Sequence, residues 1–193
     1  MLDISPKKHL GQNFLTDPNI TRKILAACSL TRDDCVLEIG PGLGALTKEL
    51  VARTRRVIAI ETDGRLCGKL RAQIPDETLD VIHADFLKYD LAFLPLNLKV
   101  VGNLPYNIAS GIIARILNAG VHFRFLFITV QLEFGRRMLA KPNTKDYSAF
   151  SCFVQYFTLG TLLCLVLRLH NFALQSYELM SQYVAWVSHA NYL

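Results

Sequence analysis

The chain has 193 residues, of which 51% are hydrophobic and 19% charged, and this composition is that of a globular domain rather than a disordered or repetitive protein. The net charge of +5 gives only a weak preference for an anionic partner. Five cysteines without a C-x-x-C pair argue against a disulfide framework and a zinc site, and the scattered histidines predict no metal. The absence of an apolar leader predicts a cytoplasmic protein, with a mitochondrial or nucleolar paralogue left open.

The chain begins with an expected extended arm over residues 1–16. Asp17 as N-cap and Pro18 at the first helical position predict a helix that runs to about Cys28. Short apolar runs then alternate with helical patterns, which predicts an α/β fold with a mainly parallel sheet covered by helices on both faces. We expect strands at 35–39, 57–60, 79–82, 98–101 and 123–130, and helices at 45–52, 65–73, 108–118, 132–140 and 146–157.

Residues 147–167 carry no charge and are long and apolar enough to be a candidate membrane span. Serine, glutamine and threonine side chains within the stretch favour a different interpretation, a buried helix that runs into a buried strand. We therefore expect no membrane partner.

A glycine-rich loop follows the first predicted strand, in the pattern G-x-G-x-G from Gly40 to Gly44. Glycines allow a tight turn and the close approach of a ligand, which makes Gly40 and Gly42 candidate cofactor-binding residues. The spacing differs from the G-x-G-x-x-G of dinucleotide sites, and Pro41 removes one N–H that a pyrophosphate needs. The loop therefore favours a ligand without phosphate, such as a cationic sulfonium compound.

Acidic residues end the second and third predicted strands, where a parallel sheet binds its ligands. Glu61 is placed to accept hydrogen bonds from the ribose hydroxyls of an adenosine group, and Asp85 from an adenine amino group. Phe86 is placed to pack on the adenine ring. The structural alternatives are a surface acid for Glu61, a helix N-cap for Asp85 and ordinary core packing for Phe86.

The tetrad Asn103-Leu-Pro-Tyr106 follows the fourth predicted strand and supplies what methylation of an exocyclic amine needs. The Asn103 side-chain oxygen and the Leu104 carbonyl can accept the two amine hydrogens and draw the nitrogen toward tetrahedral geometry. Pro105 stiffens the turn, and Tyr106 offers a ring on which a flipped base can stack. These four residues are the candidate catalytic group; the alternative is an ordinary turn after a strand.

The order of these motifs resembles the small-subunit rRNA adenine dimethyltransferases of the KsgA and Dim1 type, and also the related Erm-type large-subunit rRNA methyltransferases. The resemblance covers about residues 7–157 and is carried by residues 9–15, 36–47, 103–108, 131–133 and 142–147 together with Glu61 and Asp85. It implies a Rossmann-like fold that binds S-adenosyl-L-methionine. Its further implication is that Asn13 and Leu15 close over the methionine end, with Gly40 beside it.

The resemblance also implies a substrate, two adjacent adenines in a small-subunit rRNA hairpin, each methylated twice during ribosome biogenesis. Asn103 would contact both the cofactor and the target amine. Asn107 and Ile108 extend the motif in the small-subunit form. The implied partner is a 30S-type pre-ribosomal particle.

The sequence departs from the family pattern near Thr158. Residues 158–193 lack the expected proline-rich hairpin and helical domain, so we divide the chain into a methyltransferase domain, 1–157, and a divergent tail, 158–193. We expect the sheet to lack its final hairpin and to expose an edge, with residues 160–169 as one possible replacement strand. A frameshift, an alternative exon or a gene-model error explains such a change, and the other reading frames of the coding DNA test this.

Several alternatives stay open at the level of sequence. The altered tail allows a catalytically impaired RNA-binding assembly factor, and the motifs allow an Erm-like 23S rRNA adenine methyltransferase. A small-molecule methyltransferase is disfavoured by the basic arm and the Asn103–Tyr106 tetrad. An NAD-dependent dehydrogenase is disfavoured by Pro41 and the glycine spacing.

Overall fold

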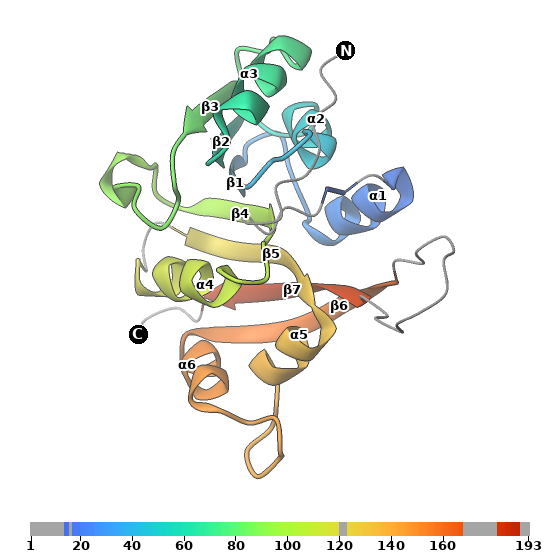
Figure 1. Cartoon of the computed structure of the whole chain (residues 1–193), viewed down its shortest axis with the longest axis vertical. Coiled ribbons are helices and arrows are strands. Elements are labelled where there is room, and N and C mark those ends of the chain that lie inside the picture. Colours follow the sequence, from blue (N-terminus) through green and yellow to red (C-terminus); the bar gives the residue numbers. More distant parts are fainter. Residues whose placement is uncertain (1–13, 16, 120–122, 168–180, 190–193) are drawn as a thin grey trace.

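A computed structural model describes residues 14, 15, 17–119, 123–167 and 181–189. Its helices and strands follow the predicted alternation (Figure 1). They are, in order, α1 Pro18–Ala27, β1 Cys35–Ile39, α2 Ala45–Val51, β2 Arg56–Glu61, α3 Gly64–Gln73, β3 Leu79–His83, the 3-10 turn η2 Leu91–Phe93, β4 Leu98–Asn103, α4 Ala109–Asn118, β5 Phe123–Gln131, α5 Leu132–Met138, α6 Ala149–Phe157, β6 Thr158–Leu167 and β7 Ser181–His189.

The strands form one seven-stranded sheet in the order β3-β2-β1-β4-β5-β7-β6. The first five strands in this order are parallel, whereas β7 runs antiparallel to both β5 and β6. The chain therefore reverses its direction of travel across the sheet between β3 and β4, because β4 pairs with β1. This crossover places the loops after β1 and β4 beside each other, which is where open α/β sheets bind ligands.

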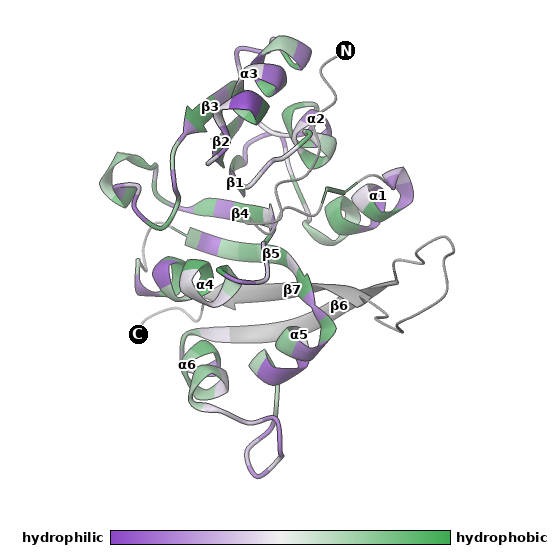
Figure 2. Cartoon of the chain, viewed as in Figure 1, coloured by the Kyte–Doolittle hydropathy of each residue, from purple (hydrophilic) through white to green (hydrophobic). Residues whose placement is uncertain are grey.

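Alternating side chains of the strands build a separate core on each face of the sheet. On one face, Val36, Val57 and Val101 pack with residues of α1 and α2. On the other, Leu37 and Val100 lie in a larger cluster with residues of α4, α5 and α6. Figure 2 shows that the loop between α5 and α6 is hydrophilic. The predicted α/β fold with helices on both faces is thus confirmed.

The helix boundaries follow local capping signals. The Asp17 carboxylate accepts a hydrogen bond from the Asn19 N–H at 2.8 Å, and Pro18 begins α1 as predicted. The last helix starts later than the predicted residue 146, because Ser148 and Ser151 form a reciprocal capping box that sets the N-terminus of α6.

The expectation of a missing hairpin and an exposed β5 edge is wrong. Strand β7 pairs with β5 from Phe125 to Gln131, and β6 pairs with β7 along its length. The sequence reason is that residues 158–167 and 181–189 contain no charged residue; the first range is rich in leucine with two threonines, and the second contains valine, tyrosine and tryptophan, which favour strands. The strands of the tail thus belong to the same sheet as residues 35–131, and the division at residue 157 stays a prediction.

The uncharged stretch 147–167 forms α6 followed by β6, which is the helix-then-strand order that the alternative interpretation predicted. The predicted burial does not hold throughout α6, because Tyr156 is exposed. Within the described part of the chain, no helix has the length and apolar character required to cross a membrane.

A buried ion pair ties the α1–β1 connection to the middle of the sheet. The Lys99 ammonium on β4 donates to the Asp34 carboxylate at 2.8 Å and to the Ser29 carbonyl at 2.7 Å. Burial raises the pKa of Asp34, but hydrogen bonds from Lys99 and Thr31 together outweigh it, so the pKa lies below its usual range.

Replacing Lys99 with methionine leaves the Asp34 carboxylate partly buried without its cation. We expect Lys99→Met to lower the free energy of unfolding by about 3 kcal/mol at pH 7 in urea titrations. Because the folded-state pKa of Asp34 is lowered, its contribution to stability is present above the unfolded pKa and is lost as pH falls through the folded value. The difference between the variant and wild type should therefore shrink in acid. Lys48→Met, at an exposed site on α2, is the control, and equal effects of the two substitutions would contradict the assignment.

Candidate cofactor and substrate site

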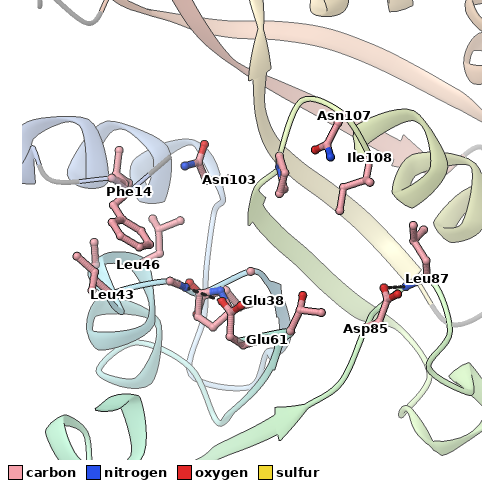
Figure 3. Close-up of a pocket in the computed structure, with 17 residues that line it drawn as sticks. Phe14, Glu38, Leu43, Leu46, Glu61, Asp85, Leu87, Asn103, Asn107 and Ile108 are labelled. Carbon is pink, nitrogen blue, oxygen red and sulfur yellow. Dashed lines mark hydrogen bonds between the residues drawn. The ribbon is translucent and has the colours of Figure 1, made fainter. Parts of the chain in front are cut away.

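A pocket of about 260 Å³ lies at the carboxyl ends of β1, β2 and β4, and residues from five separate segments line it (Figure 3). The lining residues are Phe14, Leu15, Glu38, Gly40, Pro41, Gly42, Leu43, Ala45, Leu46, Glu61, Thr62, Asp85, Leu87, Asn103, Pro105, Asn107 and Ile108. The structure thus brings the glycine loop, both predicted acids and the Asn103 motif into one cavity.

The glycine loop adopts a backbone conformation that other residues rarely take. Gly40, Gly42 and Gly44 all have positive φ, at 67°, 58° and 81°. A Cβ added at Gly40 would meet no other atom within 4 Å, so the backbone of Gly40 faces open space on the pocket wall. The Gly40 N–H donates to the Ile60 carbonyl at 3.0 Å, which anchors the loop to β2. The loop is therefore built for close approach of a ligand.

The Glu61 carboxylate is buried at the end of β2 and joins the glycine loop to the start of α3. Its Oε2 accepts the Gly42 N–H at 3.2 Å, and its Oε1 accepts the Asp63 N–H at 2.9 Å. Burial raises the pKa of Glu61, and the backbone hydrogen bonds partly oppose this. Each carboxylate oxygen can accept a further hydrogen bond, which is the capacity that a ribose diol requires. The alternative of a surface acid is excluded, because the residue is only 6% exposed.

Asp85 lies on the opposite wall of the pocket from the glycine loop (Figure 3). Its Oδ1 accepts the Leu87 N–H at 2.9 Å, so the side chain shapes the turn after β3 as well as lining the cavity. Its Oδ2 lies 3.9 Å from the Lys88 ammonium, which is strongly exposed. The turn role and the ligand role are compatible, because one oxygen has no backbone partner among these contacts.

The prediction that Phe86 packs on an adenine ring needs correction. Phe86 is 4% exposed and belongs to the core cluster on the α4 face, and the pocket is lined instead by its neighbours Asp85 and Leu87. The physical reason is the tight turn that follows Asp85, in which the Lys88 and Tyr89 N–H groups both donate to the Asp85 carbonyl at 2.9 Å, and this turn leaves the Phe86 ring in the core. The alternative of core packing was the right one for this residue.

The Asn103 motif is divided between the pocket and the core. Asn103 and Pro105 line the cavity, whereas the Leu104 side chain is buried in the core and leaves only its backbone for chemistry. Tyr106 is half-buried and is not among the lining residues. The Thr129 hydroxyl on β5 donates to the Asn103 Oδ1 at 2.5 Å. The tetrad therefore presents one amide and one turn to the cavity rather than four side chains.

Some lining residues were missed as site residues, and one predicted residue is not described. Phe14 and Leu15 of the arm reach the pocket, of which only Leu15 was predicted, and Asn13 lies outside the described residues. Asn107 was noted only as a family marker, yet it lines the cavity. Glu38 was missed, although its place two residues before Gly40 on an otherwise apolar strand was a signal in the sequence.

Glu38 is an ionisable residue in the floor of the pocket, and its burial makes the charged form of its carboxyl group unfavourable. It is 2% exposed, and its Oε2 has no hydrogen-bond partner among the described residues. Burial, with a smaller contribution from the nearby Glu61 carboxylate, raises the pKa of Glu38 to about 8. An acid held in this state fits a cationic ligand, since a positive charge beside it would offset the cost of ionisation.

The raised pKa of Glu38 predicts a specific pH dependence of stability. The folded protein holds a proton on Glu38 that the unfolded chain releases near pH 4.5, so stability falls as pH rises from there toward about 8. We expect Glu38→Gln to raise the melting temperature relative to wild type at pH 8.5 and to change it little at pH 5, in scanning calorimetry. Equal shifts at both pH values would contradict this, and Glu49→Gln on the surface of α2 is the control.

The strand order, the glycine loop and the strand-end acids together define a Rossmann-like methyltransferase, and solved structures agree. A dimethyladenosine transferase from Plasmodium falciparum superposes with a TM-score of 0.80 at 26% identity, covering 92% of this chain and 64% of that one. The 23S rRNA methyltransferase ErmE superposes with a TM-score of 0.75 at 29% identity, covering 93% of this chain and 70% of that one.

Sequence comparison places the chain within one family of this class. A family model described as ribosomal RNA adenine dimethylase matches residues 4–168, so the chain belongs to that family. The ribosomal RNA small subunit methyltransferase A of Ligilactobacillus salivarius is 44% identical over 158 residues, which cover 78% of this chain and 53% of that protein. The chain thus spans about half the length of the curated relatives it matches.

Proposed function

We propose that this chain transfers methyl groups from S-adenosyl-L-methionine to the N6 amines of two adjacent adenines in small-subunit rRNA, during assembly of the 30S-type particle. The observation that supports this most directly is the presence of Gly40, Glu61, Asp85 and Asn103 on the walls of one pocket. The similarity to small-subunit methyltransferases supports the choice of RNA. Cys28, Cys35, Cys67 and Cys152 are free thiols, which fits the cytoplasmic location that we propose.

The residues of the cofactor half fit S-adenosyl-L-methionine by charge and shape. The Glu61 carboxylate is assigned to the ribose hydroxyls and Asp85 to the adenine amine, while Gly40 and Gly42 admit the ligand close to the backbone. The buried Glu38 carboxyl suits a cationic compound. The cofactor, when bound, supplies an activated methyl group, so the protein needs no strong base. We assign the arm residues Asn13 and Leu15 to closing over its methionine end.

The acceptor half positions the target amine. The Asn103 Oδ1 and the Leu104 carbonyl accept the amine hydrogens, which makes the nitrogen lone pair available and stabilises the positive charge that develops on the nitrogen. Pro105 holds the turn rigid, so that the amine is aligned before reaction. Tyr106 is assigned to stacking on the flipped base from the rim, since its side chain lies outside the cavity lining.

Substitution of Gly40 tests the cofactor half. A Cβ at this position clashes with nothing in the protein, so we expect Gly40→Ala to cost about 1 kcal/mol of stability through its positive φ. The same Cβ occupies ligand space, and the dissociation constant for S-adenosyl-L-methionine should rise at least about tenfold in calorimetric titration. The control is Gly68→Ala on α3, where a Cβ also meets nothing and φ is ordinary. Unchanged affinity in Gly40→Ala would contradict the proposed cofactor position.

Methyl transfer itself is tested with labelled S-adenosyl-L-methionine and undermethylated 30S particles, with 50S particles in parallel. We expect incorporation into the 30S particles that falls at least about 100-fold in Asn103→Ala, because an acceptor used at the transition state is lost. Asn118→Ala, at the end of α4, is the control. Incorporation into 50S particles alone would favour an Erm-like target. Cofactor binding without any transfer would favour an impaired assembly factor.

A further inference from the structure

Thr129 on β5 contacts the Asn103 motif twice, at the Asn103 side-chain oxygen that the proposed chemistry uses and at the Leu104 backbone N–H. Its hydroxyl donates to the Asn103 Oδ1 at 2.5 Å, and its backbone carbonyl accepts the Leu104 N–H at 3.2 Å. Asn103 and Thr129 are direct register partners at the ends of the parallel strands β4 and β5, so their side chains lie on the same face of the sheet.

The buried environment of Thr129 explains why its hydroxyl hydrogen bonds to Asn103. The residue is 3% exposed, and its neighbours along β5, Ile128 and Val130, point into the core of the opposite face. A buried hydroxyl in such a position needs a partner, and the Asn103 amide oxygen supplies it. Thr129 does not line the pocket, whereas Asn103 does, so any effect of Thr129 on a ligand passes through Asn103.

We infer that Thr129 is a positioning residue for methyl transfer, an inference that rests on the proposed function. A side-chain amide can turn about its own axis and exchange its oxygen and nitrogen positions, and only the oxygen accepts a hydrogen from the target amine. The Thr129 hydroxyl holds the oxygen in one place through one of its two lone pairs. In the proposed chemistry the target amine uses the other lone pair of the same oxygen. The Thr129 carbonyl also holds the Asn103–Leu104 peptide by accepting its N–H.

The test compares Thr129→Val, which keeps the shape and the strand propensity but removes the hydroxyl, with Thr129→Ser, which keeps the hydroxyl. We expect kcat for 30S methylation to fall about 3- to 10-fold in the valine variant, the size of one neutral hydrogen bond. The serine variant should keep most of the kcat that the valine variant loses. The KM for the particle and the dissociation constant for S-adenosyl-L-methionine should both stay within about twofold, since the hydroxyl aligns rather than binds.

A second measurement does not depend on activity. The side-chain amide signals of Asn103, identified by their loss in Asn103→Ala, should move in the nitrogen–proton NMR spectrum of Thr129→Val and keep their wild-type positions in Thr129→Ser. Unmoved signals in the valine variant, or equal kcat losses in both variants, would overturn the inference. A wild-type chain without transferase activity would instead refute the proposed function, and the NMR comparison alone would then decide whether Thr129 positions Asn103.

Discussion

The parallel alignment of β1 to β5 is the constraint on which the site depends. In parallel strands every carboxyl end faces the same edge of the sheet, so residues that end different strands become neighbours without any contact in sequence. Glu61 ends β2, Asp85 follows β3 and Asn103 ends β4, and all three line one pocket. A slip of one residue in any of these registers would turn a functional side chain to the other face.

The site keeps polar groups where the core would otherwise be apolar. Glu38 occupies an inward position between Leu37 and Ile39, Asn103 ends a run of buried residues on β4, and Thr129 lies between the buried apolar residues Ile128 and Val130 on β5. A natural protein retains such groups where function needs them, which is why these positions mark the site as clearly as the glycine loop does.

Most of the fold could be predicted from sequence, because alternation of short apolar runs with helical stripes is a local signal. Asp17 and Pro18 set the start of α1, and the strand ends at Glu61 and Asn103 were visible as polar residues after apolar ones. The side-chain direction of Phe86 could not be predicted, because it depends on the conformation of the turn that follows β3. Thr129 was also hidden, since its contact with Asn103 spans 26 residues and arises only from strand pairing. Strand β6 overlaps the replacement strand expected at residues 160–169, whereas β7 was missed because its residues follow no family motif.

The neighbouring strands β1 and β4 join two halves with separate tasks. Apart from the arm residues, those assigned to the methyl donor lie at or just after the carboxyl ends of β1, β2 and β3, whereas those assigned to the acceptor lie on β4, β5 and the turn after β4. The two strands lie close together at this point, because a Cβ added at Gly102 on β4 would lie 3.0 Å from the Ile39 carbonyl oxygen on β1. With this division, changes in the loops on the acceptor side can alter the RNA target while the donor pocket stays unchanged. Diversification within this family can therefore proceed by altering half of a sheet.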